Sequence, residues 1–225
     1  MKEINNKKFN KRIIENLDNL KENVKNDFNK INSCFDKKYI LGGFVRDSIL
    51  QVLYEYNFPL NDLDILIENK DFDFKIKNFS KNKFSRFGGL KLEYSNFEID
   101  VFDLENIFFL KENPCIKKNL ENVLKSCDLT TSALAYDLAE NKIYSFRAIE
   151  DIYKKEINVS NDNGEIVPTL CRLILHSDKM NFKIGKTGIN YIKKNYSPEK
   201  DKEIKDFLEY KNIPHLFSLV KKYLN

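Results

Sequence analysis

A glycine pair followed by an acidic D-x-D pattern constrains this chain more than any other feature. The segment Leu41–Asp47 reads Leu-Gly-Gly-Phe-Val-Arg-Asp and opens a stretch with helical spacing. Because they lack Cβ atoms, Gly42 and Gly43 let backbone N–H groups at a helix start approach an anion that a side chain would block. Farther along, Asp62 and Asp64 alternate with apolar residues, so a strand would point both carboxylates to one face. The pattern predicts a phosphate cradle beside two carboxylates.

Asp100 is a third acidic candidate. It stands between Ile99 and Val101, so it would also project from a strand face. Mg²⁺ prefers oxygen ligands, and two metal ions about 3.5–4 Å apart need several carboxylates around them. We therefore expect Asp62, Asp64 and Asp100 to form a two-metal Mg²⁺ site, with Mn²⁺ as an alternative. The structural alternative is that Asp62 ends a strand and Asp100 is a solvated edge residue.

Composition sets the limits on size and partners. The 225 residues are 42% hydrophobic, which suffices for one large domain or one domain with a small annex. A net charge of +4 permits an RNA partner without requiring one. Widely spaced cysteines and two lone histidines give no zinc-ligand pair. No segment approaches the ~20 apolar residues of a membrane span, and no signal peptide is evident. We therefore expect a cytoplasmic protein that does not bind membranes. The composition gives no indication of the oligomeric state.

The periodicity along the chain predicts an α+β fold: a mixed sheet with flanking helices, followed by a small helical annex. An apolar stripe over residues 3–32 predicts one helix, which either packs on the domain or binds a partner. The other expected elements are strands at Tyr39–Leu41, Leu63–Ile67, Lys83–Phe87, Leu90–Tyr94 and Glu98–Phe102, helices at Val45–Tyr56 and Ile116–Ser126, and a hairpin of Ser132–Tyr136 with Lys142–Phe146. We place a first domain at residues 1–147 and a helical one at 148–225.

Five blocks of sequence together resemble the polymerase-β-like nucleotidyltransferases. The resemblance is specifically to the head domain that bacterial CCA-adding enzymes share with poly(A) polymerases. In order along the chain, the blocks are Gly42–Asp47, Asp62–Asp64, Arg86–Gly89, Ile99–Val101 and Asp128–Tyr136.

The resemblance implies transfer of a nucleoside monophosphate from an NTP, either ATP or CTP, to an acceptor hydroxyl with release of pyrophosphate. The leading acceptor is an RNA 3′ end. The implied catalytic and metal-binding residues are Asp62, Asp64 and Asp100; the implied nucleotide-binding residues are Gly42, Gly43, Arg46, Asp47, Asp128 and Arg172. The fork-shaped guanidinium of Arg46 independently suits phosphate oxygens. Asp47 either holds the helix start or contacts the nucleotide.

The chain also departs from the family pattern. Ser126 and Cys127 stand where arginines are usual, and Ser132 stands where an Asn is usual. The segment Glu165–Arg172 keeps one arginine of the base-reading motif, and Arg172 either pairs with an acidic neighbour or contacts the nucleotide. Two rival functions follow: the same chemistry on a small molecule or protein, and a catalytically silent module that binds nucleotide or RNA.

Overall fold

The computed structural model describes residues 1–68, 83–84, 89–107, 110, 112–113, 115–162 and 164–223. The chain divides into two compact units. The first contains Met1–Leu124 and Ser132–Phe146, and the second contains Lys125–Thr131 and Arg147–Asn225. The second unit therefore takes a short segment from within the first.

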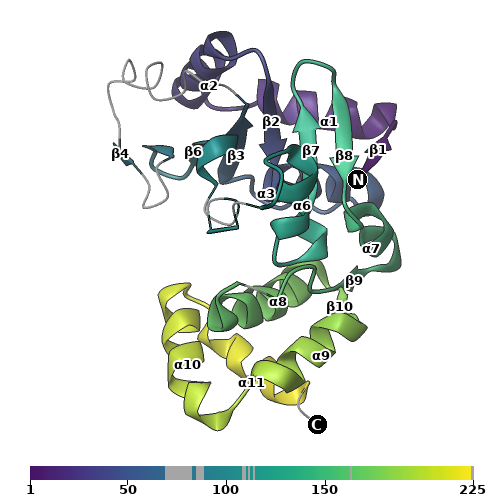
Figure 1. The fold of residues 1–225 in the computed structure, drawn as a ribbon, viewed down its shortest axis with the longest axis vertical. Coiled ribbons are helices and arrows are strands. Elements are labelled where there is room, and N and C mark those ends of the chain that lie inside the picture. The colour runs from purple at the N-terminus through teal and green to yellow at the C-terminus, as the bar shows by residue number, and fades with distance from the viewer. Residues whose placement is uncertain are drawn as a thin grey trace. The chain divides into compact units, whose positions relative to one another are not determined.

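One mixed sheet forms the centre of the first unit (Figure 1). Within the described residues it has eight strands in the order β1-β8-β7-β2-β3-β6-β5-β4. Their bounds are β1 Lys2–Ile4, β2 Lys38–Leu41, β3 Asp62–Ile67, β4 Lys83–Phe84, β5 Leu90–Glu93, β6 Glu98–Asp103, β7 Leu134–Asp137 and β8 Lys142–Ser145. Strand β3 runs parallel to β6, and each of the other neighbouring pairs is antiparallel. The predicted α+β class with a mixed sheet is confirmed.

Helix α3, Gly42–Tyr54, begins directly at the end of β2 and packs against β3 and β7. Helix α1, Lys7–Asp18, packs against α3 in turn and crosses behind β7 and β8 in Figure 1. The apolar side chains Leu63 and Ile65 of β3 are fully buried in this layer. Because side chains alternate along a strand, the residues between them lie on the opposite face of the sheet.

The predicted N-terminal helix over residues 3–32 is wrong in two respects, because its first residues belong to strand β1 and two helices follow. Helix α1 ends at Asp18, and α2 spans Glu22–Cys34. Leu17 and Val24 are both buried, one on each helix. Their spacing of two helical turns preserves the apolar period across the break, so the pattern could not show it.

Three other predicted elements are present, and the first of them has different bounds. Helix α6 covers Leu120–Ser126 and begins after Asn119, whose side chain accepts a hydrogen bond from the Asn122 backbone N–H at 2.9 Å. The expected helix from Ile116 therefore starts later. Strand β4 covers the first two residues of the predicted Lys83–Phe87 strand, and residues 85–87 lie outside the described residues. The predicted hairpin is present as β7 and β8.

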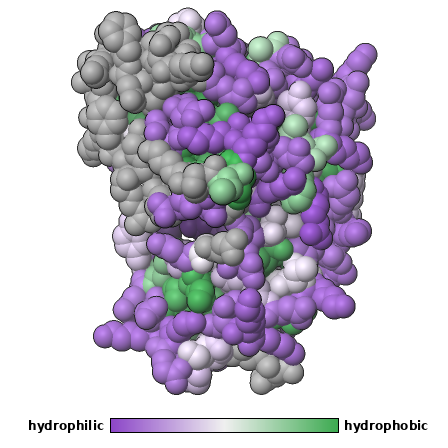
Figure 2. All heavy atoms as spheres, in the orientation of Figure 1, coloured by the Kyte–Doolittle hydropathy of each residue, from purple (hydrophilic) through white to green (hydrophobic). Residues whose placement is uncertain are grey.

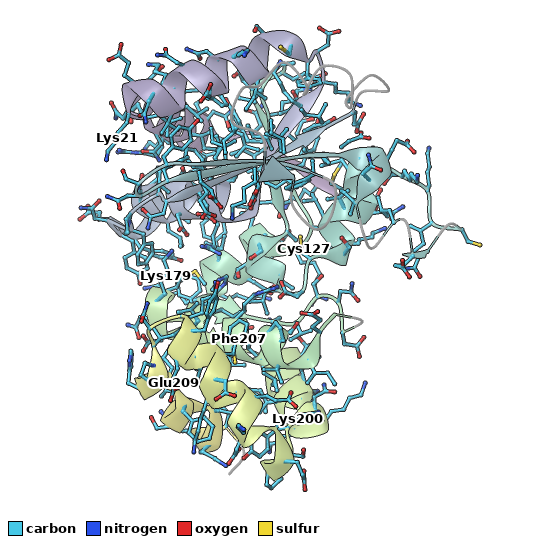
Figure 3. All side chains as sticks on the ribbon, turned by 90° about the vertical axis from the view of Figure 1, so that its left-hand side faces the viewer. Lys21, Cys127, Lys179, Lys200, Phe207 and Glu209 are labelled. Carbon is cyan, nitrogen blue, oxygen red and sulfur yellow. The ribbon has the colours of Figure 1, made fainter. Side chains whose placement is uncertain are left out.

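The second unit is mainly helical, as the sequence predicts. Its helices are α7 Ala148–Lys154, α8 Ile166–Met180, α9 Lys186–Asn195, α10 Asp201–Tyr210 and α11 Phe217–Lys222. Figure 3 shows Phe207 and Glu209 on α10, and Lys200 in the short 3-10 turn before it. A small parallel pair that the sequence analysis missed, β9 Glu156–Ile157 and β10 Lys183–Ile184, links α7 and α8 to α9.

A buried polar network joins the segment Lys125–Thr131 to the rest of the second unit. The Thr130 hydroxyl donates to the Asp151 carboxylate at 2.5 Å, and the Asn158 side-chain amide donates to the same oxygen at 3.1 Å. All three residues are buried. Leu129 pairs with Val159 in an isolated β-bridge. This segment is thus integrated into the second unit by both backbone and side-chain bonds.

Most of the surface seen in Figure 2 belongs to hydrophilic residues, in keeping with the 32% of charged residues in the chain. No helix within the described ranges is long and apolar enough to span a bilayer. Each of the four cysteines is a free thiol.

Candidate active site

The three predicted acidic residues lie on one face of the sheet, on two neighbouring strands. In the parallel pairing of β3 with β6, Asp64 stands directly opposite Asp100, and Asp62 stands opposite Glu98. Residues opposite each other point to the same face, and so do residues two apart on one strand. Asp62 is exposed, whereas Asp64 and Asp100 are partly buried. The structure therefore gathers the predicted carboxylates on one sheet face, here called the acidic face.

Burial and mutual repulsion change the acid–base properties of this face. Burial, followed by the negative charges of Asp62 and Asp100, raises the pKa of Asp64 to about 7. Burial also raises the pKa of Asp100. Charged carboxylates crowded in a partly desolvated place favour either a proton or a cation. The acidic face thus has the electrostatics of a cation-binding surface.

Lys91 is a residue of this region that the sequence analysis missed. It stands opposite Asp100 in the antiparallel pairing of β5 with β6. Its ammonium group lies 2.8 Å from the Glu98 carboxylate and counteracts the rise in the pKa of Asp64 and Asp100. The antiparallel register of β5 with the neighbouring strand β6 brings Lys91 to the acidic face, and the local sequence pattern does not give that register.

The glycine pair begins α3 beside two of the aspartates. Gly42 has a φ of +60°, a backbone conformation that L side chains rarely adopt. A Cβ placed on Gly42 would lie 3.9 Å from Asp64 Oδ2, and one placed on Gly43 would lie 3.9 Å from Asp62 Oδ2. The start of α3 and the acidic face therefore adjoin. The helix start supplies backbone N–H donors and a positive dipole end where an anionic group could rest between helix and carboxylates.

Arg46 and Asp47 lie inside the first turns of α3 and are both 4% exposed. Arg46 Nε donates to Asp47 Oδ1 at 2.6 Å. The Arg46 guanidinium also reaches Gly43, since a Cβ there would lie 3.7 Å from Arg46 Nη2. The pair thus supports the helix start from within. A phosphate contact by Arg46 stays a prediction, and the structural role considered for Asp47 agrees with its position.

The donor set of the acidic face suits a hard divalent cation. Three carboxylates supply the oxygen ligands that Mg²⁺ prefers, and a cation would relieve the repulsion that raises the pKa of Asp64. Among the described residues, however, no group of three or more Asp, Glu, His or Cys side chains is drawn together closely enough to hold a metal ion. The three carboxylates fit the ion by chemistry and charge. In this structure, however, their oxygen atoms do not converge on a common metal position.

The other two predicted nucleotide-binding residues meet in the second unit. Arg172, on α8, places Nη1 2.5 Å from Asp128 Oδ2. The Arg172 side chain is 49% exposed and the Asp128 side chain 17% exposed. Of the two sequence-based interpretations of Arg172, pairing with an acidic neighbour is thus present. The predicted Arg86–Gly89 block lies mainly outside the described residues.

The chain is similar in sequence and in fold to CCA-adding enzymes. No family model matches the chain. The CCA-adding enzyme of Streptococcus uberis is 28% identical over 140 residues, which cover 57% of this chain and 32% of that enzyme. An apo CCA-adding enzyme structure has a TM-score of 0.63 at 19% identity and covers 95% of this chain and 53% of its own. The Thermotoga maritima CCA-adding enzyme complexed with tRNA has a TM-score of 0.60 at 20% identity and covers 90% of this chain and 50% of its own.

The sheet with its glycine-led helix and acidic strands has the fold of the polymerase-β-like nucleotidyltransferases. Within that class the similarity is to CCA-adding enzymes, as the sequence motifs predict. The chain spans about a third of the curated relative and about half of these solved chains.

Proposed function

We propose that this chain is a nucleotidyltransferase that moves a nucleoside monophosphate from an NTP to an acceptor hydroxyl and releases pyrophosphate. The leading acceptor is an RNA 3′ end. The observation that carries the proposal is the acidic face: Asp64 and Asp100 are paired across β3 and β6, with Asp62 two residues away, beside the start of α3. The names of similar proteins, which include CCA-adding enzymes solved with ATP and with CTP, support this chemistry and these donors.

In this proposal each group has a distinct task. Asp62, Asp64 and Asp100 would hold Mg²⁺, which supplies charge neutralisation at the phosphates and activation of the hydroxyl when bound. The N–H groups at Gly42 and Gly43 would bind phosphate oxygens. Holding donor and acceptor in line accounts for much of the rate enhancement in phosphoryl transfer, so a catalytic histidine is not required.

In the second unit, Asp128 and Arg172 would contact the nucleotide as a pair. One guanidinium N–H of Arg172 is committed to Asp128, which leaves the other donors of the fork available. An arginine held at one edge by a carboxylate presents a fixed hydrogen-bonding face, which suits contact with a base or a phosphate.

A second candidate keeps the reaction and changes the acceptor to a small molecule or a protein. The departures from the family pattern favour it, because Ser126, Cys127 and Ser132 replace residues that the resemblance leads us to expect.

One experiment tests both. The pure protein is incubated with Mg²⁺, each α-labelled NTP in turn, and either total RNA or a cell extract free of RNA. Label in RNA supports the leading proposal, label in protein or a small molecule supports the second, and no label in any fraction contradicts both.

Variants test the assignment of the acidic face. Asp62→Ala, Asp64→Ala and Asp100→Ala should each lower turnover by about 10³-fold, because each removes a ligand that contributes several kcal/mol to the transition state. Asp18→Ala, which removes an exposed aspartate on α1, is the matched control. Near-normal turnover in any of the three would remove that residue from the proposed metal site.

A further inference from the structure

A cleft of about 390 Å³ opens in the first unit, next to Asn61, the residue that precedes β3. It lies among the link between α1 and α2, the C-terminal half of α3, and the turn between β5 and β6. Six of its fourteen lining residues carry side-chain amides: Asn16, Asn19, Asn23, Gln51, Asn61 and Asn96. The rings of Phe58, Tyr94 and Phe97 also line it, and Lys21 is its only charged lining residue among those that the structure describes. Lys21 stands at the start of α2 (Figure 3).

Much of the hydrogen-bonding capacity of these amides is available to a ligand. Asn16 is an exception, because its side-chain amide donates to Ser48 at 2.8 Å and to Gln51 at 2.9 Å. Asn16 and Gln51 are thus bonded to each other. The side chains of the other four amide residues form no hydrogen bond with another residue in the described ranges; these are Asn19, Asn23, Asn61 and Asn96. Each carries two donors and an acceptor. The cleft is therefore uncharged over most of its lining and able to match a polar ligand edge.

A second hollow reaches the acidic face and shares part of the lining of the cleft. A neighbouring hollow of about 530 Å³ is lined by Asn61, Asp62, Glu98 and the turn residues 94–97. Asn61 and residues 94–97 also line the amide cleft, so the two spaces have five lining residues in common. A ligand that follows these shared residues out of the cleft would reach Asp62, the first carboxylate of the acidic face.

The charge of the cleft lining indicates which part of a substrate could bind in the cleft. Lys21 is the one charged side chain among the described residues that line the cleft, so the cleft holds neither a metal-binding carboxylate nor several cations with which a triphosphate could pair. A nucleobase is neutral and planar, and asparagine and glutamine amides pair with base edges while aromatic rings stack on base faces. One lysine cannot neutralise an extended backbone, whose binding needs several cations. The cleft therefore suits a single nucleoside rather than a long strand.

We propose that this amide-lined cleft binds the terminal nucleoside of an acceptor RNA and directs its hydroxyl to the Asp62 end of the acidic face. The inference rests on the proposed function and adds to it the place of the acceptor. It also separates the two substrates, with phosphates at the start of α3 and the acceptor base between α2 and the β5–β6 turn.

Direct binding can be measured without turnover. Side-chain amide signals in ¹H–¹⁵N spectra of the full chain, assigned through Asn23→Ala and Asn96→Ala, are followed while adenosine, cytidine or a single-stranded ribopentanucleotide is added. We expect the signals of cleft amides to move with the nucleosides and the RNA, and not with inorganic tripolyphosphate. Unmoved signals with every nucleoside and RNA, or equal movement with tripolyphosphate, would overturn the proposal.

Kinetics supply the second readout. The double variant Asn23→Ala/Asn96→Ala should raise the KM for acceptor RNA about tenfold, equivalent to about 1.4 kcal/mol, the scale of one or two hydrogen bonds. Its KM for NTP should stay within about twofold, since the amides do not contact the donor in this proposal. Asn29→Ala, an exposed asparagine on the same helix outside the cleft, is the matched control. An unchanged acceptor KM in the double variant contradicts the proposal.

The two proposals fail in different ways. If the wild-type chain transfers no label but RNA moves the cleft amides, the transfer reaction is wrong and the nucleoside site stands. If label is transferred to RNA and the cleft amides do not respond, the transfer reaction stands and the site is wrong.

Discussion

Among single residues, Asp64 is a carboxyl group whose ionised form is opposed both by burial and by neighbouring negative charge. Its pKa is raised to about 7 from an ordinary value of 3.8. Because the folded chain binds this proton more tightly than the unfolded chain, the free energy of unfolding falls as the pH rises between those two values. A shift of about three units sets an upper limit of about 4 kcal/mol, and solvent access to the partly exposed carboxyl reduces it to about 1–2 kcal/mol.

We therefore predict that Asp64→Asn raises the midpoint of thermal unfolding at pH 8 without divalent cations. The gain should shrink as the pH is lowered toward 4, where Asp64 is protonated in the folded chain and the pH approaches its ordinary pKa of 3.8 in the unfolded chain. In the proposed site, Mg²⁺ should stabilise the wild type and leave the variant nearly unchanged, because the ion binds the ionised carboxylate. Thermal melts at several pH values with and without Mg²⁺ check this. A stability difference independent of pH would show that the Asp64 charge is not the cause.

Arg46 and Asp47 form the other residue-scale case, a buried pair whose partners depend on each other. Removal of one member of a buried ion pair leaves an uncompensated charge and costs about 3–5 kcal/mol. We predict a loss of this size in the unfolding free energy of Arg46→Ala, measured by urea denaturation. Arg46→Ala/Asp47→Asn should lose less than the sum of the two single variants, since no charge then stays buried alone. Strict additivity would mean that other contacts, rather than their pairing, hold these residues.

At the scale of elements, the two glycines at the start of α3 differ in what they require. Gly42 needs its backbone conformation, whereas Gly43 matters for the space that it leaves free. Gly42 has a φ of +60°, so Gly42→Ala should lower the unfolding free energy by about 1–2 kcal/mol. Gly43 needs no positive φ, and an added Cβ would meet its neighbours at 3.7 and 3.9 Å, which are ordinary contact distances. Gly43→Ala should therefore leave the midpoint of thermal unfolding nearly unchanged.

The proposed phosphate cradle adds a functional half to this prediction. A methyl group on Gly43 would occupy space beside the helix start, so Gly43→Ala should weaken NTP binding about tenfold or more despite its intact fold. Calorimetric titration with NTP and Mg²⁺ measures this. Unchanged NTP affinity in Gly43→Ala would remove the residue from the cradle.

The same element shows what local sequence can and cannot predict. The glycine pair and the alternation around Asp62 and Asp64 are local signals, and α3 and β3 lie within a few residues of the expected bounds. The break between α1 and α2 left no signal, because it keeps the apolar period. The two-residue strands β9 and β10 are too short to carry a pattern. Lys91 reaches the acidic face through strand pairing, which is a property of the folded sheet.

At the scale of the whole molecule, the second unit depends on residues that precede β7 and β8 in the chain. Within the segment Lys125–Thr131, the side chain of Leu129 is buried. The segment also forms several hydrogen bonds with the rest of the second unit; for example, the Thr130 N–H donates to the Asn158 carbonyl at 2.9 Å. The chain then returns to the sheet of the first unit. A division at residue 147 alone would separate this segment from its partners, and nothing in the local pattern indicates that.

We predict that a fragment of residues 125–225 unfolds cooperatively, whereas a fragment of residues 147–225 does not. The shorter fragment loses the hydrogen bond from Thr130 to Asp151 and the ion pair of Asp128 with Arg172. It also exposes the surface that Leu129 covers. Burial of one leucine contributes about 2 kcal/mol and each hydrogen bond about 1 kcal/mol, so the difference should reach about 4 kcal/mol, comparable to the whole stability of a small domain. Circular dichroism melts of both fragments measure it. Equal melting midpoints of the two fragments would mean that Lys125–Thr131 does not stabilise the second unit. A non-cooperative melt of residues 125–225 would mean that the second unit does not fold by itself.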